Sequence, residues 1–191
     1  SIYKLKTYQR IKAFIEKYNI NEKREFINNE EVQSIFELLK KVNWNEISKG
    51  IPVRFHGDYH FENILFKNKK FLLIDWRQDF SGLLNYGDIY YDLAKLLHGI
   101  IVSHKIVNKN KYIFKKKLNK IDVSIKKVKN YSLYISDYKK WILVNNYDFK
   151  KVELLTALIY LNIAVLHHHP YDKFLYYFGK LYLHKILKKN G

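Results

Sequence analysis

Residues 54–75 read Arg-Phe-His-Gly-Asp-Tyr-His-Phe-Glu-Asn-Ile-Leu-Phe-Lys-Asn-Lys-Lys-Phe-Leu-Leu-Ile-Asp, and the most informative pattern in the chain lies here. Two short apolar runs, residues 64–66 and 71–74, flank a polar segment, residues 67–70. This pattern predicts a β-hairpin. The two ends of a hairpin lie side by side, so we expect Asn63 at its start and Asp75 at its finish to lie close together, near Asp58.

These three side chains carry the oxygen atoms that a phosphoryl-transfer site needs. Magnesium prefers carboxylate and amide oxygens and keeps part of its shell for phosphate and water, so Asn63 and Asp75 suit a metal–nucleotide complex. Asp58 would then remain to accept the proton of an attacking hydroxyl. The alternative is that all three merely cap turns, as Asp and Asn commonly do. Turn capping explains each residue but not the set.

Several motifs between Arg54 and Leu97 occur in the order found in a known family. They are His56-Gly57-Asp58 with Asn63, then Ile74-Asp75-Trp76, Gly87-Asp88 and Tyr91-Asp92-Leu93-Ala94. Together they resemble the aminoglycoside phosphotransferase and choline kinase family, relatives of the protein kinases. In protein kinases the matching elements are H-R-D-x-x-x-x-N and D-F-G. Here Gly57 replaces the Arg, and Asp75-Trp76-Arg77 replaces D-F-G.

The resemblance implies a fold and a role for each residue. The expected fold is α+β and mainly α-helical, the C-terminal lobe of a protein-kinase-like fold whose short hairpin carries the catalytic and metal loops. Asp58 would be the catalytic base, Asn63 and Asp75 would hold Mg²⁺ with ATP as phosphoryl donor, and His56 and Asp92 would support the catalytic loop.

The acceptor implied by the resemblance is a hydroxyl of a small molecule. Family substrates include sugars, aminoglycosides and amino-alcohols such as choline, and residues 74–99 resemble domains associated with bacterial surface-polysaccharide synthesis, which favours a sugar. Four aromatic residues are candidates for contact with the acceptor, although core packing explains them equally well: Tyr59, Trp76, Tyr86 and Tyr90. A second reading is a catalytically silent, kinase-like binding module.

The domain organisation follows from the same comparison. We expect one kinase-like C-terminal lobe over residues 1–191, with a catalytic core at about 52–104 and a helical, substrate-binding part at about 105–191. A complete kinase also has a nucleotide lobe with a strand-borne Lys and a covering loop. Neither is found before Arg54, where Gly50 is the one glycine. We therefore expect a missing N-terminal lobe in the parent chain, and the absence of Met also suggests a fragment.

Composition limits the other possibilities. The chain has 191 residues, a net charge of +17 and no cysteine, which excludes disulfides and thiolate metal sites. Only four of its 35 basic residues are arginines. A solvated lysine surface is therefore favoured over nucleic-acid binding. No signal peptide or membrane span is evident, which predicts a cytoplasmic protein.

Apolar spacing predicts most of the remaining elements. Helices are expected at residues 2–18, from about 29 to 39 with Asn29 as cap, 88–104, 137–145, 148–167 and 170–187. Short strands are expected at 53–55 and, from partial alternation, at 128–136. Residues 105–130 are rich in Lys and Asn, and the sequence leaves open whether they form a solvated face, a binding rim or a mobile insertion.

Overall fold

The computed structural model describes residues 2–79 and 82–189. Helices make up about half of the chain and alternate with small sheets, so the predicted mixture of helix and strand is confirmed. The narrower assignment to a kinase-like C-terminal lobe stays a prediction. Among the described helices, none combines the length and the apolar content that a membrane crossing requires.

The chain forms two compact units. The first contains residues 1–48, 105–126 and 157–191, and the second contains residues 49–104 and 127–156. Helix α7 (Phe149–Ala164) contributes its first half to the second unit and its last turns to the first. The expectation of one lobe over residues 1–191, with a core at 52–104 and a helical part at 105–191, stays a prediction.

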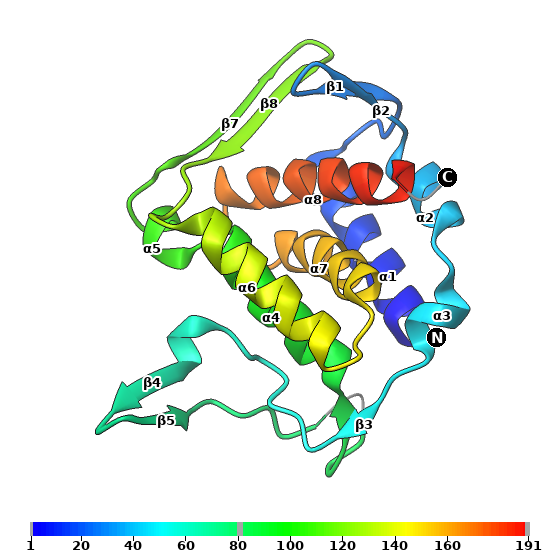
Figure 1. Ribbon diagram of the computed structural model, residues 1–191. Coiled ribbons are helices and arrows are strands. Elements are labelled where there is room, and N and C mark those ends of the chain that lie inside the picture. The colour runs from blue at the N-terminus through cyan, green and yellow to red at the C-terminus, as the bar shows by residue number, and fades with distance from the viewer. Residues whose placement is uncertain (1, 80–81, 190–191) are drawn as a thin grey trace. The chain divides into compact units, whose positions relative to one another are not determined.

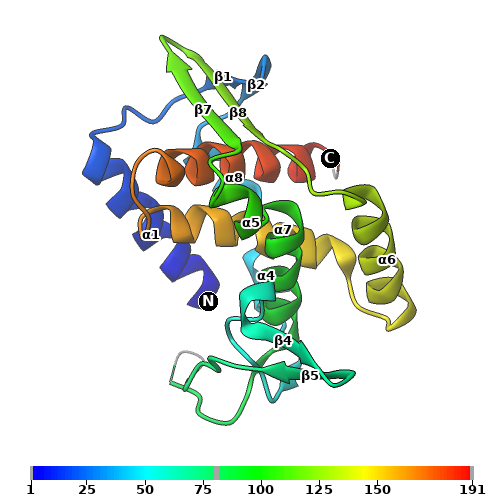
Figure 2. The same ribbon diagram turned by 90° about the vertical axis from the view of Figure 1, so that its left-hand side faces the viewer.

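The first unit is built around α8 (Tyr171–Lys188) and a four-stranded sheet. Its other helices are α1 (Ile2–Tyr18), α2 (Ile35–Lys41) and α3 (Trp44–Ser48). The strands are β1 (Glu25–Ile27), β2 (Glu30–Val32), β7 (Tyr112–Lys117) and β8 (Lys120–Ile125), in the order β2-β1-β8-β7. The sheet lies over α8 (Figure 1), and Figure 2 shows its two hairpins side by side.

Burial explains why the sheet forms. Ile121, Val123 and Ile125 are buried at alternate positions of β8, and the ring of Phe114 on β7 stacks on Tyr177 of α8 at 5.5 Å. The ammonium of the fully buried Lys180 lies 2.5 Å from Glu22 and 2.7 Å from Glu25. A buried lysine needs such partners because an unpaired charge is costly to desolvate.

One sequence prediction in this unit is corrected, and a segment that the sequence left open is now assigned. The predicted helix from about 29 to 39 is a β-hairpin followed by a shorter helix. Asn28 and Asn29 both have positive φ, as a tight hairpin turn requires, and α2 begins after Ser34, which forms a capping box with Glu37. The Lys-rich residues 105–130, left open by the sequence, contain the β7–β8 hairpin and the short helix α5 (His104–Val107).

The second unit packs α4 (Ile89–Ile101) against α6 (Tyr131–Val144) and the first half of α7. The phenol of Tyr138 donates to the carbonyl of Leu93 at 2.7 Å, and the hydroxyl of Thr156 donates to the carbonyl of Ala94 at 3.2 Å. The strand predicted at 128–136 is wrong, because α6 begins at Tyr131. Its more buried residues recur at helical spacing: Tyr131, Ile135, Tyr138 and Ile142.

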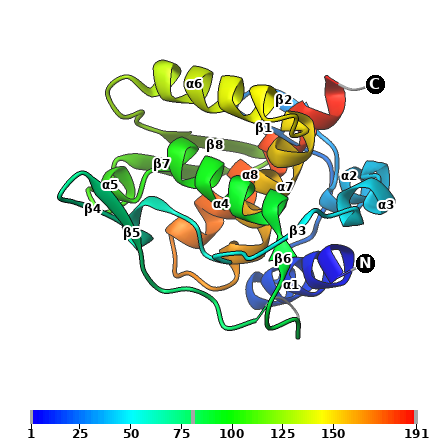
Figure 3. The ribbon, with the colours of Figure 1, turned by 60° about the horizontal axis from the view of Figure 1, so that its bottom comes forward.

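Two short strand pairs place the predicted site next to α4. β3 (Pro52–Val53) pairs with β6 (Gly87–Asp88), and Figure 3 shows β6 leading directly into α4. β4 (Ile64–Lys67) and β5 (Lys70–Leu73) form the predicted hairpin, with Ile64 opposite Leu73. A short 3₁₀ helix, η1 (Phe61–Asn63), precedes β4. The predicted hairpin and the predicted helix beginning near residue 88 are thus confirmed.

Candidate active site

The loop from His56 to Asp58 is attached to the first turn of α4. The buried carboxylate of Asp92 accepts the backbone N–H of His56 at 2.6 Å and that of Gly57 at 2.8 Å. Burial raises the pKa of Asp92, and the two N–H groups partly offset this rise because they favour the ionised form. Asp92 thus fixes the backbone of the loop immediately before Asp58.

Glycine at position 57 is required by both conformation and space. Its φ is +78°, a region that side chains with a Cβ rarely adopt. An added Cβ would lie 2.6 Å from Cβ of Arg77, far inside van der Waals contact. The N–H of Arg77 also donates to the carbonyl of His56 at 2.9 Å. The absence of a side chain at Gly57 therefore lets the segment after Asp75 approach the loop of residues 56–58 closely.

His56 connects the loop to the end of the hairpin. His56 is buried, with only 3% of the residue exposed. The Nδ1 atom accepts the N–H of Asp58 at 3.3 Å, which leaves Nε2 to donate to the carbonyl of Ile74 at 2.7 Å. His56 therefore holds the residue before Asp75 against the loop that carries Asp58.

Asn63 and Asp75 lie at the base of the β4–β5 hairpin. The N–H of Ile74 donates to the carbonyl of Asn63 at 3.0 Å, and the side-chain amide of Asn63 donates to the carbonyl of Asp58 at 3.0 Å. Asn63 is buried, whereas Asp75 is exposed and has a φ of 56°. A non-glycine residue with a positive φ is strained, and such strain is common at functional sites, where the surrounding structure holds a side chain in place.

This donor set fits a magnesium ion shared with a nucleotide. The amide nitrogen of Asn63 is used by Asp58, so its oxygen is the atom left to bind a cation, together with the carboxylate of Asp75. In the described part of the chain, no three His, Cys, Asp or Glu side chains gather around a point that could hold a metal. Magnesium commonly takes one or two protein oxygens and fills its shell with phosphate and water.

Two cationic side chains, Lys95 and Arg77, and the imidazole of His60 surround Asp58. The ammonium of Lys95 lies 2.8 Å from its Oδ1, while His60 and Arg77 lie 3.5 and 3.7 Å from its Oδ2. Burial alone would raise the pKa of Asp58, but Lys95, followed by His60 and Arg77, lowers it below its usual value. Asp58 is therefore an ionised carboxylate at neutral pH.

The neighbouring phenol of Tyr91 does not compete with Asp58 as a base. Burial raises the pKa of Tyr91 to about 12, and the negative charge of Asp58 contributes to the rise. The phenol therefore stays neutral when the carboxylate is ionised, and Asp58 is the group of this pair that can accept a proton.

Sequence reasoning missed the cations around Asp58. Lys95 lies three residues after Asp92, in an otherwise apolar run from Leu93 to Leu97. A lone lysine on the apolar side of a helix was the available signal, because lysine is rarely buried without a partner. His60 and Arg77 carry no such signal, since their approach to Asp58 depends on how the two loops fold together.

The candidate acceptor residues differ in exposure. Trp76 is 46% exposed, with its ring 4.9 Å from that of His56, and Tyr86 is 60% exposed in the loop before β6. Tyr59 is partly buried, with its ring 5.8 Å from that of His56. Trp76 and Tyr86 thus present aromatic surface, and Tyr59 presents less.

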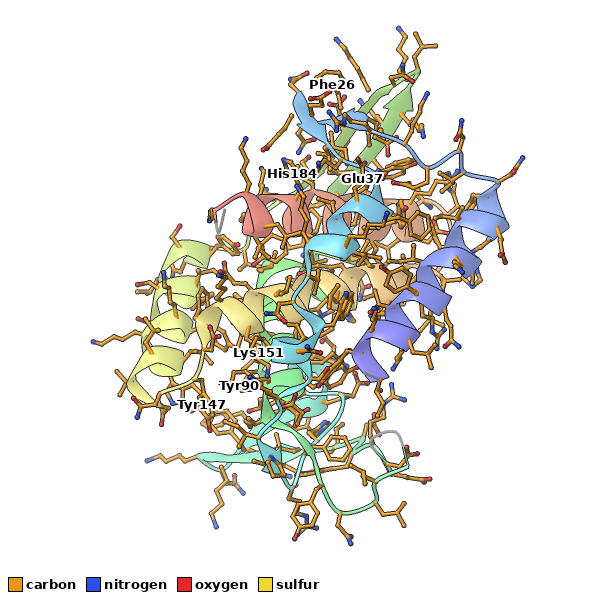
Figure 4. All side chains as sticks on the ribbon, turned by 90° about the vertical axis from the view of Figure 1, so that its right-hand side faces the viewer. Phe26, Glu37, Tyr90, Tyr147, Lys151 and His184 are labelled. Atoms are coloured by element: carbon orange, nitrogen blue, oxygen red, sulfur yellow. The ribbon has the colours of Figure 1, made fainter. Side chains whose placement is uncertain are left out.

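Tyr90 lies in a different environment. It is only 7% exposed, its ring packs edge-on against Tyr147 at 5.9 Å, and the ammonium of Lys151 lies 4.3 Å from its centre. Figure 4 shows these three side chains together. The hydroxyl of Tyr90 accepts the N–H of Asp148 at 3.1 Å. The observed contacts of Tyr90 are those of a packed residue, and its role toward an acceptor stays a prediction.

Comparison with known proteins agrees with the resemblance that the motifs carry. Residues 7–105, a little over half of the chain, match the model of the Phosphotransferase enzyme family (APH). The matched range contains the loop of residues 56–58, the β4–β5 hairpin and the whole of α4. No curated protein and no solved structure matches significantly. On the strength of the family match, the chain belongs to the phosphotransferase enzyme family.

Proposed function

We propose that this protein transfers the γ-phosphoryl group of ATP to a hydroxyl group of a small molecule. The observation that carries the proposal is the joining of Asp58, Asn63 and the end of the hairpin at Asp75 through direct hydrogen bonds, with Asp58 held ionised. Family membership supports a phosphotransferase in general. ATP as donor and the hydroxyl as acceptor are the parts that we propose.

Asp58 would orient the acceptor hydroxyl and take its proton while the new bond from oxygen to phosphorus forms. The bond between the γ-phosphorus and the bridging oxygen breaks, and ADP leaves. Asn63 and Asp75 would hold Mg²⁺, which when bound neutralises phosphate charge. His56 and Asp92 keep the loop in place, and this matters because phosphoryl transfer relies on positioning and charge stabilisation.

We propose a sugar or sugar-derived acceptor ahead of an aminoglycoside or an amino-alcohol. The exposed rings of Trp76 and Tyr86 support a ligand with an apolar face that can stack on them. A nucleotide-covering lobe from outside the described residues stays a prediction of the resemblance. The silent binding module is disfavoured, because a module without catalysis would not need the hydrogen bonds that hold the proposed base and metal ligands together.

The test compares Asp58→Asn with the wild-type protein in two assays. ADP formation is measured with Mg²⁺, ATP and a panel of sugars, aminoglycosides and amino-alcohols, and Mg²⁺-dependent ATP binding is measured separately by calorimetry. We expect turnover to fall by about 10²- to 10⁴-fold, as expected for loss of a general base, with ATP affinity nearly unchanged.

Asp137→Asn provides the matched control. Asp137 is an exposed aspartate on α6 of the same unit, and its replacement should leave turnover and ATP binding as in the wild type. Normal turnover by Asp58→Asn would show that the base assignment is wrong. Mg²⁺-dependent ATP binding without turnover on any acceptor would instead favour the silent module.

A further inference from the structure

Lys95 makes a close contact with the proposed base and lies outside the motifs quoted above. Its side chain is only 11% exposed, and its ammonium lies 2.8 Å from Oδ1 of Asp58. Lysine is rarely buried at all, and a buried ammonium requires a compensating partner. The structure places that partner at the reacting carboxylate.

Lys95 and Asp92 act on the catalytic loop from one turn of α4. Residues three apart on a helix lie on the same face. From this face, Asp92 holds the backbone N–H groups of His56 and Gly57, and Lys95 holds the side chain of Asp58. A single turn of helix therefore fixes the backbone of His56 and Gly57 and the side chain of Asp58.

The three basic side chains near Asp58 do not make equivalent contacts. Lys95 is within hydrogen-bonding distance of Oδ1, whereas His60 at 3.5 Å and Arg77 at 3.7 Å approach Oδ2 more loosely. The side chain of Arg77 is also 64% exposed, so water weakens its interaction. Oδ1 is thus the occupied oxygen, and Oδ2 is the oxygen left to face an acceptor.

We infer that Lys95 is a positioning residue for phosphoryl transfer, which holds Oδ1 of Asp58 so that Oδ2 receives the acceptor hydroxyl. The inference rests on the proposed function. The proton of the acceptor passes to Asp58, and Lys95 keeps its own protons throughout. Without Lys95 the carboxylate would be free to rotate, and misplacement of a reacting group by about 1 Å can cost roughly 100-fold in rate.

The test measures kcat and the KM for ATP in Lys95→Met, which removes the charge but keeps the length of the side chain. We expect kcat to fall by about 100-fold with less than about a two-fold change in KM, because Lys95 acts through Asp58 and not on the nucleotide. Lys95→Arg restores the charge and should recover part of the loss. Thermal unfolding of each variant, followed by circular dichroism, gives its folded fraction.

Lys127→Met is the matched control. Lys127 belongs to the same unit, and its ammonium donates to the carbonyl of Ile101 at 3.2 Å, not to a carboxylate. This variant should keep the wild-type kcat. A fall in the kcat of Lys95→Met that merely follows its folded fraction, or an equal fall in Lys127→Met, would overturn the inference.

A double variant separates positioning from a general structural effect. If Lys95 acts through Asp58, the variant carrying both Asp58→Asn and Lys95→Met turns over no more slowly than Asp58→Asn alone. An additional 100-fold loss in the double variant would contradict the inference. If the proposed function itself is wrong, the result is different, because Asp58→Asn then turns over at the wild-type rate.

Discussion

At the scale of single residues, the site depends on a close approach of two backbone segments at Gly57. Two separate features require glycine at this position: its positive φ and the closeness of Arg77. Gly82 provides a comparison, because it too has a positive φ, of +89°, but an added Cβ there would meet nothing within 4 Å. Comparing the two glycines therefore separates the free energy cost of a Cβ at positive φ from the cost of crowding by neighbouring atoms.

We predict that Gly57→Ala destabilises the protein more than Gly82→Ala does. Gly82→Ala should cost about 1 kcal/mol, the penalty for a Cβ in the left-handed region, and should leave turnover intact. Gly57→Ala should cost about 1–3 kcal/mol more, because it also crowds the packed loop, and should lower turnover. Chemical denaturation measures both changes, and equal losses would show that Arg77 does not approach Gly57 in solution.

The lowered pKa of Asp58 makes a prediction about acid stability. A carboxyl group whose pKa is lower in the folded state stabilises the protein above its unfolded pKa, and this contribution is lost as the pH falls through the folded value. The denatured chain takes up the proton first, near pH 3.8, the ordinary value for Asp. Stability should therefore decline with falling pH over the window below 3.8.

The measurement is the unfolding temperature of the wild-type protein and of Asp58→Asn as the pH is lowered from 6 to about 2. The wild-type protein should be the more stable at pH 6, and the difference between the two proteins should shrink as Asp58 becomes protonated. A difference that stays constant or widens would mean that the cations around Asp58 do not favour its ionised form.

At the scale of elements, the β4–β5 hairpin sets the spacing between Asn63 and Asp75. Its turn has positive φ at both central residues, 51° at Asn68 and 59° at Lys69. Asn accepts this conformation readily, but Lys does not, and glycine is the usual residue at the second position. The turn therefore contains a residue that is not optimal for its conformation.

We predict opposite effects for two glycine substitutions in this hairpin. Lys69→Gly should stabilise the protein, by up to about 1 kcal/mol, because it relieves the left-handed lysine. Lys67→Gly, at an exposed position of β4, should cost about 0.5–1 kcal/mol, because glycine loses more freedom in a strand. Denaturation of the two variants tests this, and stabilisation by Lys67→Gly or destabilisation by Lys69→Gly would argue against the observed turn.

Local signals explain which elements the sequence could predict. The hairpin at 64–73 and the helix from residue 89 are marked by apolar spacing within each segment, and both are present. The parallel pairing of β1 with β8 joins Phe26 to Lys120 and Ile27 to Ile121, which lie far apart in the sequence. No periodicity within either strand could reveal that pairing, and the lysines of residues 105–130 obscured the alternation of β8.

The difference between local sequence signals and tertiary contacts also explains which site residues could be predicted. Spacing alone predicted Asp58, Asn63 and Asp75 as site residues, and the resemblance added His56 and Asp92. The basic side chains around Asp58 come from α4, from the residue before η1 and from the loop after Asp75, so their convergence is a property of the tertiary structure. Of these three side chains, Lys95 alone could be noticed in the sequence, as a charged residue within an apolar helix.

At the scale of the whole molecule, the family assignment does not rest on the catalytic residues alone. The match to residues 7–105 includes most of α1 and all of α2 and β1 of the first unit, as well as the loop, hairpin and α4 of the second. The residues proposed for chemistry, from His56 to Lys95, all belong to the second unit. The proposed site therefore lies within one unit, whereas the family match extends over parts of both units.

The central claim is that Asp58 serves a phosphoryl-transfer site, and ³¹P NMR of the reaction mixture tests it most directly. With Mg²⁺, ATP and an acceptor, the wild-type protein should convert the γ-phosphate signal into that of a phosphomonoester, and Asp137→Asn should do the same. Asp58→Asn should leave the γ-phosphate signal in place. Equal phosphomonoester formation by the wild-type protein and Asp58→Asn, or release of inorganic phosphate alone by the wild-type protein, would contradict the account.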